Sequence, residues 1–278
     1  MPAERIAENL AFINWTVLTG LAVGSFGAVA LARLRTNATR GFLVFTAVCA
    51  VLFGILAYLS DQALPVAMPG SPVVANPAFD APRRVALAAF CGLAAAYAVA
   101  LVQRRRAPQL AAAALLAAVV VLACGALAWG GGSFGSVPLL LQLAVLAVAT
   151  GGVFAAMILG HWYLVTPKLP EAPLILFARV LLAVVGVQIL LFGVWVATGA
   201  GPGGAAPFAV LGGKWALFVW LRLIVGLVFP LIVSWAAIQT ARTRSMESAT
   251  GLLYINVGSI AAGTILAAGL YFGAGLLV

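Results

Sequence analysis

Long apolar stretches alternate with short polar connections along the whole chain. Eight such stretches can be placed, each close to or above the length of about 20 residues that an α-helix needs to cross a bilayer. The pattern predicts an all-α, polytopic integral membrane protein with eight transmembrane helices, and residues 1–278 are treated as a single membrane domain. The stretches are residues 9–32, 41–60, 84–102, 110–129, 138–165, 174–198, 215–239 and 250–274.

The composition supports this interpretation and leaves no room for a soluble domain. Of the 278 residues, 65% are hydrophobic and 8% are charged, whereas soluble domains carry about 25% charged residues. The net charge is +9, from 15 Lys and Arg against 6 Asp and Glu. Because basic residues gather in the cytoplasmic loops of membrane proteins, we interpret this charge as a topology signal and expect no nucleic-acid partner.

The basic residues are unevenly distributed between the two sets of loops. Nine lie in alternate loops that we assign to the cytoplasm, and four lie on the other side. The positive-inside rule therefore predicts a multi-pass protein of the cytoplasmic (inner) membrane with both termini on the outer side. The outer loop 61–83 is rich in proline, which is typical of irregular structure. The nine are Arg33, Arg35, Arg40, Arg104, Arg105, Arg106, Lys168, Arg242 and Arg244, and the four are Arg5, Arg83, Arg84 and Lys214.

Short similarities between the two halves of the chain suggest an internal repeat. Residues 24–28 and 152–156 share a Gly-x-Phe-x-Ala pattern within the first and fifth stretches. Repeat units 1–130 and 138–278 would form two parallel four-helix bundles, an arrangement that some transporters show. Chance similarity between alanine-rich helices is the alternative.

Polar residues near the outer ends of the helices form one candidate site. Arg222 lies about 10 Å inside the seventh stretch, where a charge is unfavourable unless it is paired or faces a cavity. Asp61 is its nearest acidic candidate by depth, so a structural Arg222–Asp61 pair and a ligand-facing Arg222 both stay open. A quinone needs hydrogen-bond donors at its carbonyls and an apolar slot for its ring. The candidate quinone-binding residues are Asn14, Trp15, Tyr58, Asp61, Trp220 and Arg222.

A second candidate site, for a ligand or for protons, lies at the inner ends of the helices. His161 is the single histidine, and imidazole titrates near neutral pH, so it can exchange protons with a lipophilic ligand. The alternatives are an interfacial aromatic anchor around His161 and an Arg179 side chain that extends to the headgroups. The candidates are His161, Tyr163 and Arg179, with Glu171 or Glu247 as acidic neighbours.

The remaining chemistry-bearing residues predict no catalytic or metal site. The six acidic residues lie at helix ends or in loops, which argues against a proton relay of intramembrane carboxylates. A single histidine excludes a bis-histidine haem within the chain, and the three cysteines form no CxxC pair. We therefore expect no catalytic residue, no metal, and no cofactor bound covalently or by metal ligation.

The start of the first stretch carries a resemblance to a known family. Residues 14–25, which begin with Asn14 and Trp15 and continue through Gly20 and Gly24, resemble the first helix of the polysulfide-reductase-type (NrfD-like) membrane subunits. The eight-helix count and the outer amino terminus agree with that family. The resemblance implies a subunit that anchors iron–sulfur or haem subunits on the outer face and exchanges electrons with quinone. Asn14 matches the family's polar position at the quinone end of the first helix.

We therefore expect a lipid-embedded membrane subunit of a respiratory or other redox complex that contributes a quinone or quinol site. Such a subunit is either quinone-reactive or non-catalytic, so whether the chain is itself an enzyme stays open. The alternatives are a solute or lipid transporter, a structural scaffold without its own ligand, and a membrane enzyme that acts on lipid. The repeat favours a transporter, whereas Pro230 is the only obvious break within a helix.

Overall fold

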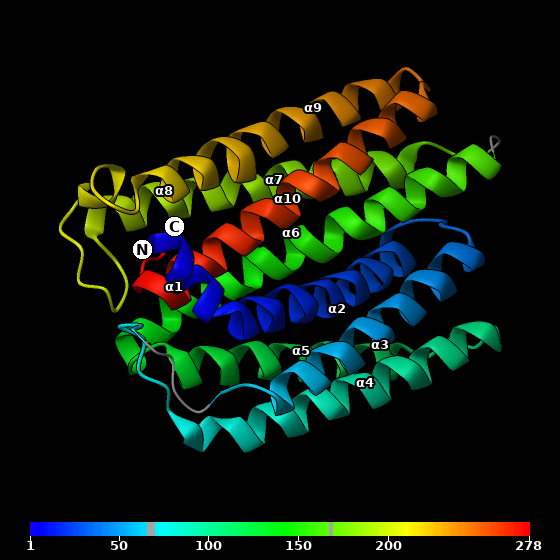
Figure 1. Cartoon of the computed structure of the whole chain (residues 1–278). Helices are drawn as coiled ribbons and strands as arrows, with labels where there is room; N and C mark the ends of the chain where they lie inside the picture. Colours follow the sequence, from blue (N-terminus) through cyan, green and yellow to red (C-terminus); the bar gives the residue numbers. More distant parts are fainter. Residues whose placement is uncertain (66–69, 167–168) are drawn as a thin grey trace.

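The computed structural model describes residues 1–65, 70–166 and 169–278, and most of them are helical (Figure 1). Within these ranges, 8 helical segments are long and apolar enough to cross a membrane. The predicted all-α membrane fold is therefore confirmed. The segments are α2 (Leu10–Arg35), α3 (Arg40–Gln62), α4 (Asp80–Val102), α5 (Pro108–Trp129), α6 (Ser133–Val165), α7 (Ala172–Thr198), the continuous run of α8 (Ala216–Leu223), η3 (Ile224–Val228) and α9 (Phe229–Arg242), and α10 (Met246–Ala274).

Some helical structure goes beyond the predicted stretches. A short helix, α1 (Pro2–Glu8), precedes α2 and packs against α10. Two 3₁₀ turns, η1 (Pro77–Phe79) and η2 (Ala209–Leu211), lie in loops. Helix α6 begins at Ser133 rather than at 138 and therefore contains Pro138, although an interior proline removes a backbone hydrogen bond and crowds the preceding turn.

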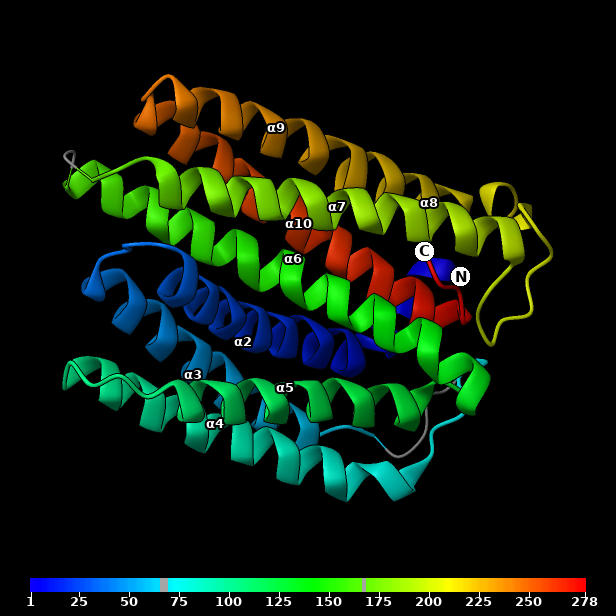
Figure 2. The same ribbon diagram turned by 180° about the vertical axis from the view of Figure 1, so that it is seen from behind.

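The spanning helices pack in two groups. In the first group α2 packs against α3, α3 against α4, and α4 against α5. In the second group α6, α7, α9 and α10 follow one another in a ring that closes between α10 and α6. Helices α2 and α6 join the groups and lie between α5 and α7 (Figure 2). The two parallel bundles and the repeat units stay predictions, because helix neighbours alone do not establish a repeat.

Glycines let α2 and α6 touch through their backbones. A Cβ atom at Gly24 would lie 1.9 Å from the Ala147 carbonyl oxygen, and one at Gly151 would lie 2.2 Å from the Ser25 nitrogen. The Ser25 hydroxyl donates to the Gly151 carbonyl at 3.4 Å. Small residues are the usual means by which membrane helices approach closely, so these positions hold the two groups together.

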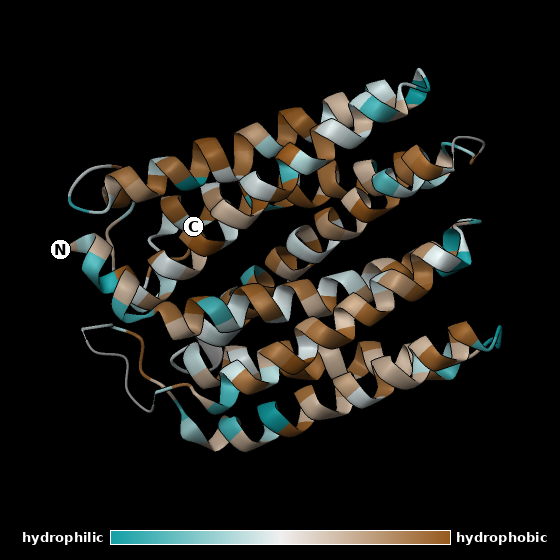
Figure 3. Ribbon diagram, turned by 45° about the vertical axis from the view of Figure 1, so that its right-hand side comes forward, coloured by the Kyte–Doolittle hydropathy of each residue, from teal (hydrophilic) through white to brown (hydrophobic). Residues whose placement is uncertain are grey.

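Both termini lie at the same end of the bundle (Figure 1). We call this the outer end, following the predicted orientation, and the opposite one the inner end; which end faces the cytoplasm stays a prediction. Hydrophobic residues dominate the middle of the helices, and hydrophilic ones gather at the ends (Figure 3). Lys168, and residues 66–69 of the predicted outer loop, lie outside the described residues.

Candidate functional site

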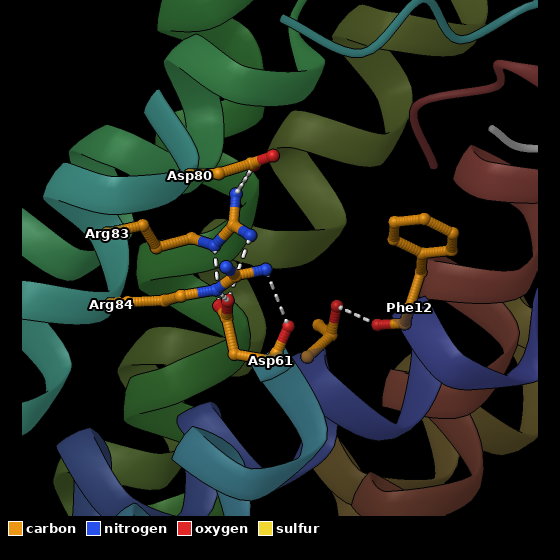
Figure 4. Close-up of polar contacts among 6 residues, drawn as sticks. Phe12, Asp61, Asp80, Arg83 and Arg84 are labelled. Atoms are coloured by element: carbon orange, nitrogen blue, oxygen red, sulfur yellow. Dashed lines mark hydrogen bonds and ion pairs between the residues drawn. The ribbon is translucent and has the colours of Figure 1, made fainter. Parts of the chain in front are cut away.

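A buried ion cluster joins α3 to α4 at the outer end (Figure 4). Arg83 is 1% exposed and donates from Nε to Asp61 Oδ2 at 2.6 Å and from Nη2 to Asp61 Oδ1 at 3.0 Å. Its Nη1 donates to Asp80 Oδ1 at 2.9 Å, and Arg84 Nε donates to Asp61 Oδ1 at 2.9 Å. Two arginines and two aspartates thus balance in charge, and each nitrogen of the Arg83 guanidinium has an acceptor. Good geometry of this kind is what a buried ion pair requires.

The start of α4 explains why Arg83 is buried. Asn76 caps the preceding turn, because its side-chain oxygen accepts from Ala78 N at 3.2 Å and its backbone N–H donates to Ala128 O at 2.7 Å. Helix α4 then begins at Asp80, within the segment predicted to be an outer loop. Arg83 consequently lies in the first turn of a packed helix rather than in water.

Two tryptophans pack against the Arg83 guanidinium of this cluster. The Arg83 guanidinium lies 4.6 Å from the Trp129 ring centroid and 5.7 Å from that of Trp15. The two rings meet edge to face, with centroids 4.8 Å apart. Arginine over an aromatic face is a favourable arrangement, worth most when it is desolvated. Trp15, a predicted quinone residue, is therefore buried against a cation, and its Nε1 has no partner in the described part of the chain.

Arg222 is bonded to Gln188, which excludes the Arg222–Asp61 pair, one of the two alternatives that the sequence left open. Arg222 Nη2 donates to Gln188 Oε1 at 2.6 Å, and its Nη1 donates to the Gly226 carbonyl at 3.3 Å. Asp61 is already occupied by Arg83 and by Arg84, and α8 packs against η3 and α10. Counting residues along the helices places Asp61 and Arg222 at similar depths, but depth does not reveal which helices are neighbours.

The Arg222 guanidinium reaches towards the middle of the membrane. It is 2% exposed, and a Cβ atom at Gly263 would lie 2.9 Å from its Nη1. Gln188 and Gly263 are each about ten residues from the outer ends of α7 and α10, which corresponds to a depth of roughly 15 Å. Helices α7 and α10 are about 40 Å long and the hydrocarbon core is about 30 Å thick, so this cation lies inside the outer half of the core. No described ion pair involves it.

The helix that carries Arg222 changes its hydrogen bonding directly after it. In the π-helical segment η3, the Phe229 N–H donates to Ile224 O instead of Val225 O, and Pro230 has no N–H to offer Gly226 O. Both released carbonyls find other donors: the Ser259 hydroxyl of α10 for Val225, and Arg222 for Gly226. Such π-helical turns occur frequently at functional sites.

Asn14 lines an open groove between α2 and α10. The groove has a volume of about 420 Å³, and its other lining residues are apolar, Ile13, Val17 and Ile265 among them. One N–H of the Asn14 amide donates to Ser60 Oγ at 3.2 Å. An amide carries two N–H donors and a carbonyl acceptor. Its second N–H and its carbonyl make no hydrogen bond within the described ranges, so they can serve a ligand.

The other predicted quinone residues do not line this groove. Tyr58 of α3 is partly buried against the main hydrophobic core. Trp220 is 43% exposed, and its Nε1 donates to Leu211 O at 3.1 Å. Trp15 and Asp61 belong to the ion cluster, and Arg222 to the second helix group. The six residues therefore do not form a single site.

The predicted inner residues are also dispersed. His161 is exposed on α6, with Nδ1 at 3.4 Å from the hydroxyl of Tyr254 on α10. Tyr163 is buried and donates to Pro170 O at 2.5 Å, and Arg179 is exposed on α7. No hydrogen bond among the described residues joins His161, Tyr163 and Arg179.

Glu171, one of their expected acidic neighbours, pairs with Arg244 instead. The Arg244 Nη2 donates to Glu171 Oε2 at 2.9 Å and so bridges the loop before α7 and the loop before α10. A backbone hydrogen bond, and then the Arg244 guanidinium, hold the pKa of Glu171 below its usual range. This loop contact is exposed, so its contribution to stability is small.

No protein-family model, no curated protein and no solved structure matches this chain. Within the described ranges, no three His, Cys, Asp or Glu side chains lie together in a way that could hold a metal ion. The Asn14 groove and the buried Arg222 are the two features of the described residues that can carry a function.

Proposed function

We propose that the chain is an integral membrane subunit of a respiratory or other redox complex, and that it contributes a quinone site at its outer end. The observation that carries this proposal is the groove between α2 and α10, whose lining is apolar except for Asn14. A lipophilic ring with a hydrogen-bonding carbonyl matches such a lining. The resemblance of residues 14–25 to NrfD-like subunits points to the same residue.

The groove suits a ligand that arrives through the bilayer. Ile13 and Val17 lie on one wall and Ile265 on the other, and side chains of this kind offer contact to a ring without competing hydrogen bonds. The free N–H of Asn14 can donate to a quinone carbonyl. Its bond to Ser60 fixes the amide from α3, so little rotational freedom is lost when a ligand binds.

Asp61 follows Ser60 directly, but its carboxylate is engaged by Arg83 and Arg84. The ion cluster therefore serves this site by holding α3 and α4 in place, rather than by taking protons from a quinol. In our proposal the proton acceptor is water at the outer surface.

A hollow at the outer end offers a place for a peripheral electron-transfer subunit. It has a volume of about 670 Å³, and its lining includes Arg5, Lys214 and Trp215. Two cations and an aromatic side chain suit an acidic protein surface, because charge complementarity guides association and Trp contributes much of the binding energy at interfaces.

The test combines purification with ligand binding. The chain, extracted from its native membrane in a mild detergent, should retain iron–sulfur or haem subunits. The variant Asn14→Leu should weaken binding of decylubiquinone by about five- to ten-fold, because one hydrogen bond is worth about 1 kcal/mol, and Ile265→Trp should abolish it by filling the groove. The control Asn37→Leu, at the exposed inner end, should bind as the wild type does. Unchanged binding in both groove variants, or a chain that purifies without redox subunits, would refute the proposal.

The surroundings of Arg222 favour a second candidate, a transporter for an anionic solute or lipid. Transporters often bind substrate near the midplane, where a helix departs from regular α geometry. Arg222 is buried in the outer half of the core directly before the π-helical segment η3, and its Nε has no partner within the described residues. Uptake of an organic anion into proteoliposomes, lost in Arg222→Met and kept in Asn14→Leu, would favour this candidate over the redox subunit.

A further inference from the structure

A cavity at the inner end of the first helix group contains a concentration of positive charge. It has a volume of about 400 Å³ and lies between the end of α2, the last turns of α4 and the start of α5. Arg33, Arg105 and Arg106 line it, and no acidic residue does. None of the ion pairs in the described ranges involves these three arginines. The site therefore has three positive charges that are available to an anion.

A buried tyrosine gives this cavity a further polar group. Tyr97 of α4 lines it and is 4% exposed. Its hydroxyl makes no hydrogen bond to any residue that the structure describes. The hydroxyl oxygen keeps some accessible surface, so a ligand in the cavity can reach it. An oxygen of a bound ligand would supply that missing partner.

The cavity continues into hydrocarbon. Leu115 lines it and also lines an adjoining cleft of about 470 Å³ between α2, α5, α6 and α7. Gly27, Val119 and Leu181 are among the cleft residues, and the cleft lining has no charged member. Leu115 is seven residues from the start of α5, which places it roughly 10 Å below the helix end. The two spaces together run from headgroup depth into the acyl-chain region.

We propose that these two spaces form one binding site for an anionic phospholipid. The phosphate lies among Arg33, Arg105 and Arg106 and accepts a hydrogen bond from Tyr97, and an acyl chain occupies the cleft past Leu115. Arginine suits this role because its planar guanidinium donates to two phosphate oxygens at once. If the inner end faces the cytoplasm as predicted, the site lies in the leaflet whose negative surface attracts basic residues.

The experiment measures lipid retention and stability of the purified full chain. After delipidation, phosphatidylglycerol and phosphatidylcholine of equal chain length are added in separate titrations. Native mass spectrometry counts bound lipid, and thermal melting reports stabilisation. We expect phosphatidylglycerol to bind at least ten-fold more tightly than phosphatidylcholine. Inorganic phosphate and glycerol 3-phosphate test whether the headgroup chemistry alone suffices, and we expect neither to compete at millimolar concentration.

Variants separate the parts of the site. Each change of Arg33, Arg105 or Arg106 to Gln should weaken phosphatidylglycerol binding by about five-fold, since a basic residue near an anionic surface is worth about 1 kcal/mol. Tyr97→Phe should weaken it by a few-fold without lowering the stability of the lipid-free protein. Gly27→Leu should block the acyl chain, and it should fold because a Cβ atom at Gly27 meets nothing within 4 Å.

A charge-matched control removes three other inner arginines. Arg35, Arg104 and Arg242 do not line the cavity, and their combined change to Gln lowers the net charge as much as the triple site variant does. It should leave lipid binding within two-fold of the wild type. Equal losses in both triple variants would mean that the surface potential alone retains the lipid. Equal binding of both phospholipids, unchanged binding in Gly27→Leu, or displacement by glycerol 3-phosphate would each overturn the proposal.

Discussion

Removal of the Asp61 charge tests whether the ion cluster holds the outer end together. In Asp61→Asn, Arg83 keeps only Asp80 as an anionic partner, and the Asp80 side chain is already 39% exposed. Arg83 itself is 1% exposed and cannot reach water without unpacking Trp15 and Trp129. Leaving a buried charge without its partner costs about 3–5 kcal/mol. Because Asp80 still pairs with Arg83, we expect the free energy of unfolding to fall by about 3 kcal/mol, the lower end of that range.

Two further variants make the measurement specific. Arg84→Gln removes the partner whose side chain is 38% exposed, and it should cost about 1 kcal/mol or less. The double variant Asp61→Asn with Arg83→Met removes both charges, so it should recover much of the loss and, with the two single variants, give a coupling of about 2 kcal/mol in a double-mutant cycle. The assay is SDS-induced unfolding in mixed micelles, followed by circular dichroism. A loss in Asp61→Asn no larger than that in Arg84→Gln, or additive single effects, would refute the reasoning.

Four other outcomes are expected. Arg222→Met and Asp61→Asn share no partner, so their effects on stability should add within about 0.5 kcal/mol, and a larger coupling would restore the rejected pair. Gly263→Ala should destabilise the protein by about 1–3 kcal/mol, since its Cβ would lie 2.6 Å from Gly226 Cα, whereas Gly258→Ala, with nothing within 4 Å, should not. The folded pKa of Glu171 is lowered, so its contribution to stability is present above its unfolded pKa and disappears as the pH falls through the folded value. Arg244→Gln should raise the pKa of Glu171 in an NMR titration, whereas the control Arg242→Gln should leave it unchanged. Single cysteines at Lys214 and Arg106, in a chain without its three native cysteines, should react with an impermeant thiol reagent from the outer and the cytoplasmic side respectively; the opposite result would reverse the predicted orientation.

The sequence predicted the spanning helices well because each is a long apolar run, a signal that depends on local composition alone. It missed the burial of Arg83, since hydropathy counted this residue as loop whereas Asn76 and Asp80 start the helix earlier. It singled out Arg222 correctly as a buried charge. The partner Gln188 was not foreseen: the sequence left a pair with Asp61 and a ligand-facing role open, because an acid is the expected partner of an arginine. Helix neighbours and the π-helical turn depend on tertiary packing, which no single segment encodes.

The order in which charges and their partners emerge has a consequence for membrane insertion. An Asp or Arg near the middle of a spanning helix opposes insertion by about 2.5–3.5 kcal/mol. Gln188 precedes Arg222 by 34 residues, so α7 is already synthesised and can bind the guanidinium when α8 enters. Asp61 is instead synthesised 22 residues before Arg83. It lies at the end of its helix, so its carboxylate can stay hydrated in the headgroup region until Arg83 follows. At translation rates of about 5–20 residues per second, the interval between the synthesis of Asp61 and that of Arg83 lasts only seconds. The chain thus delivers each buried charge to the bilayer either after its partner or at a depth where it can remain hydrated.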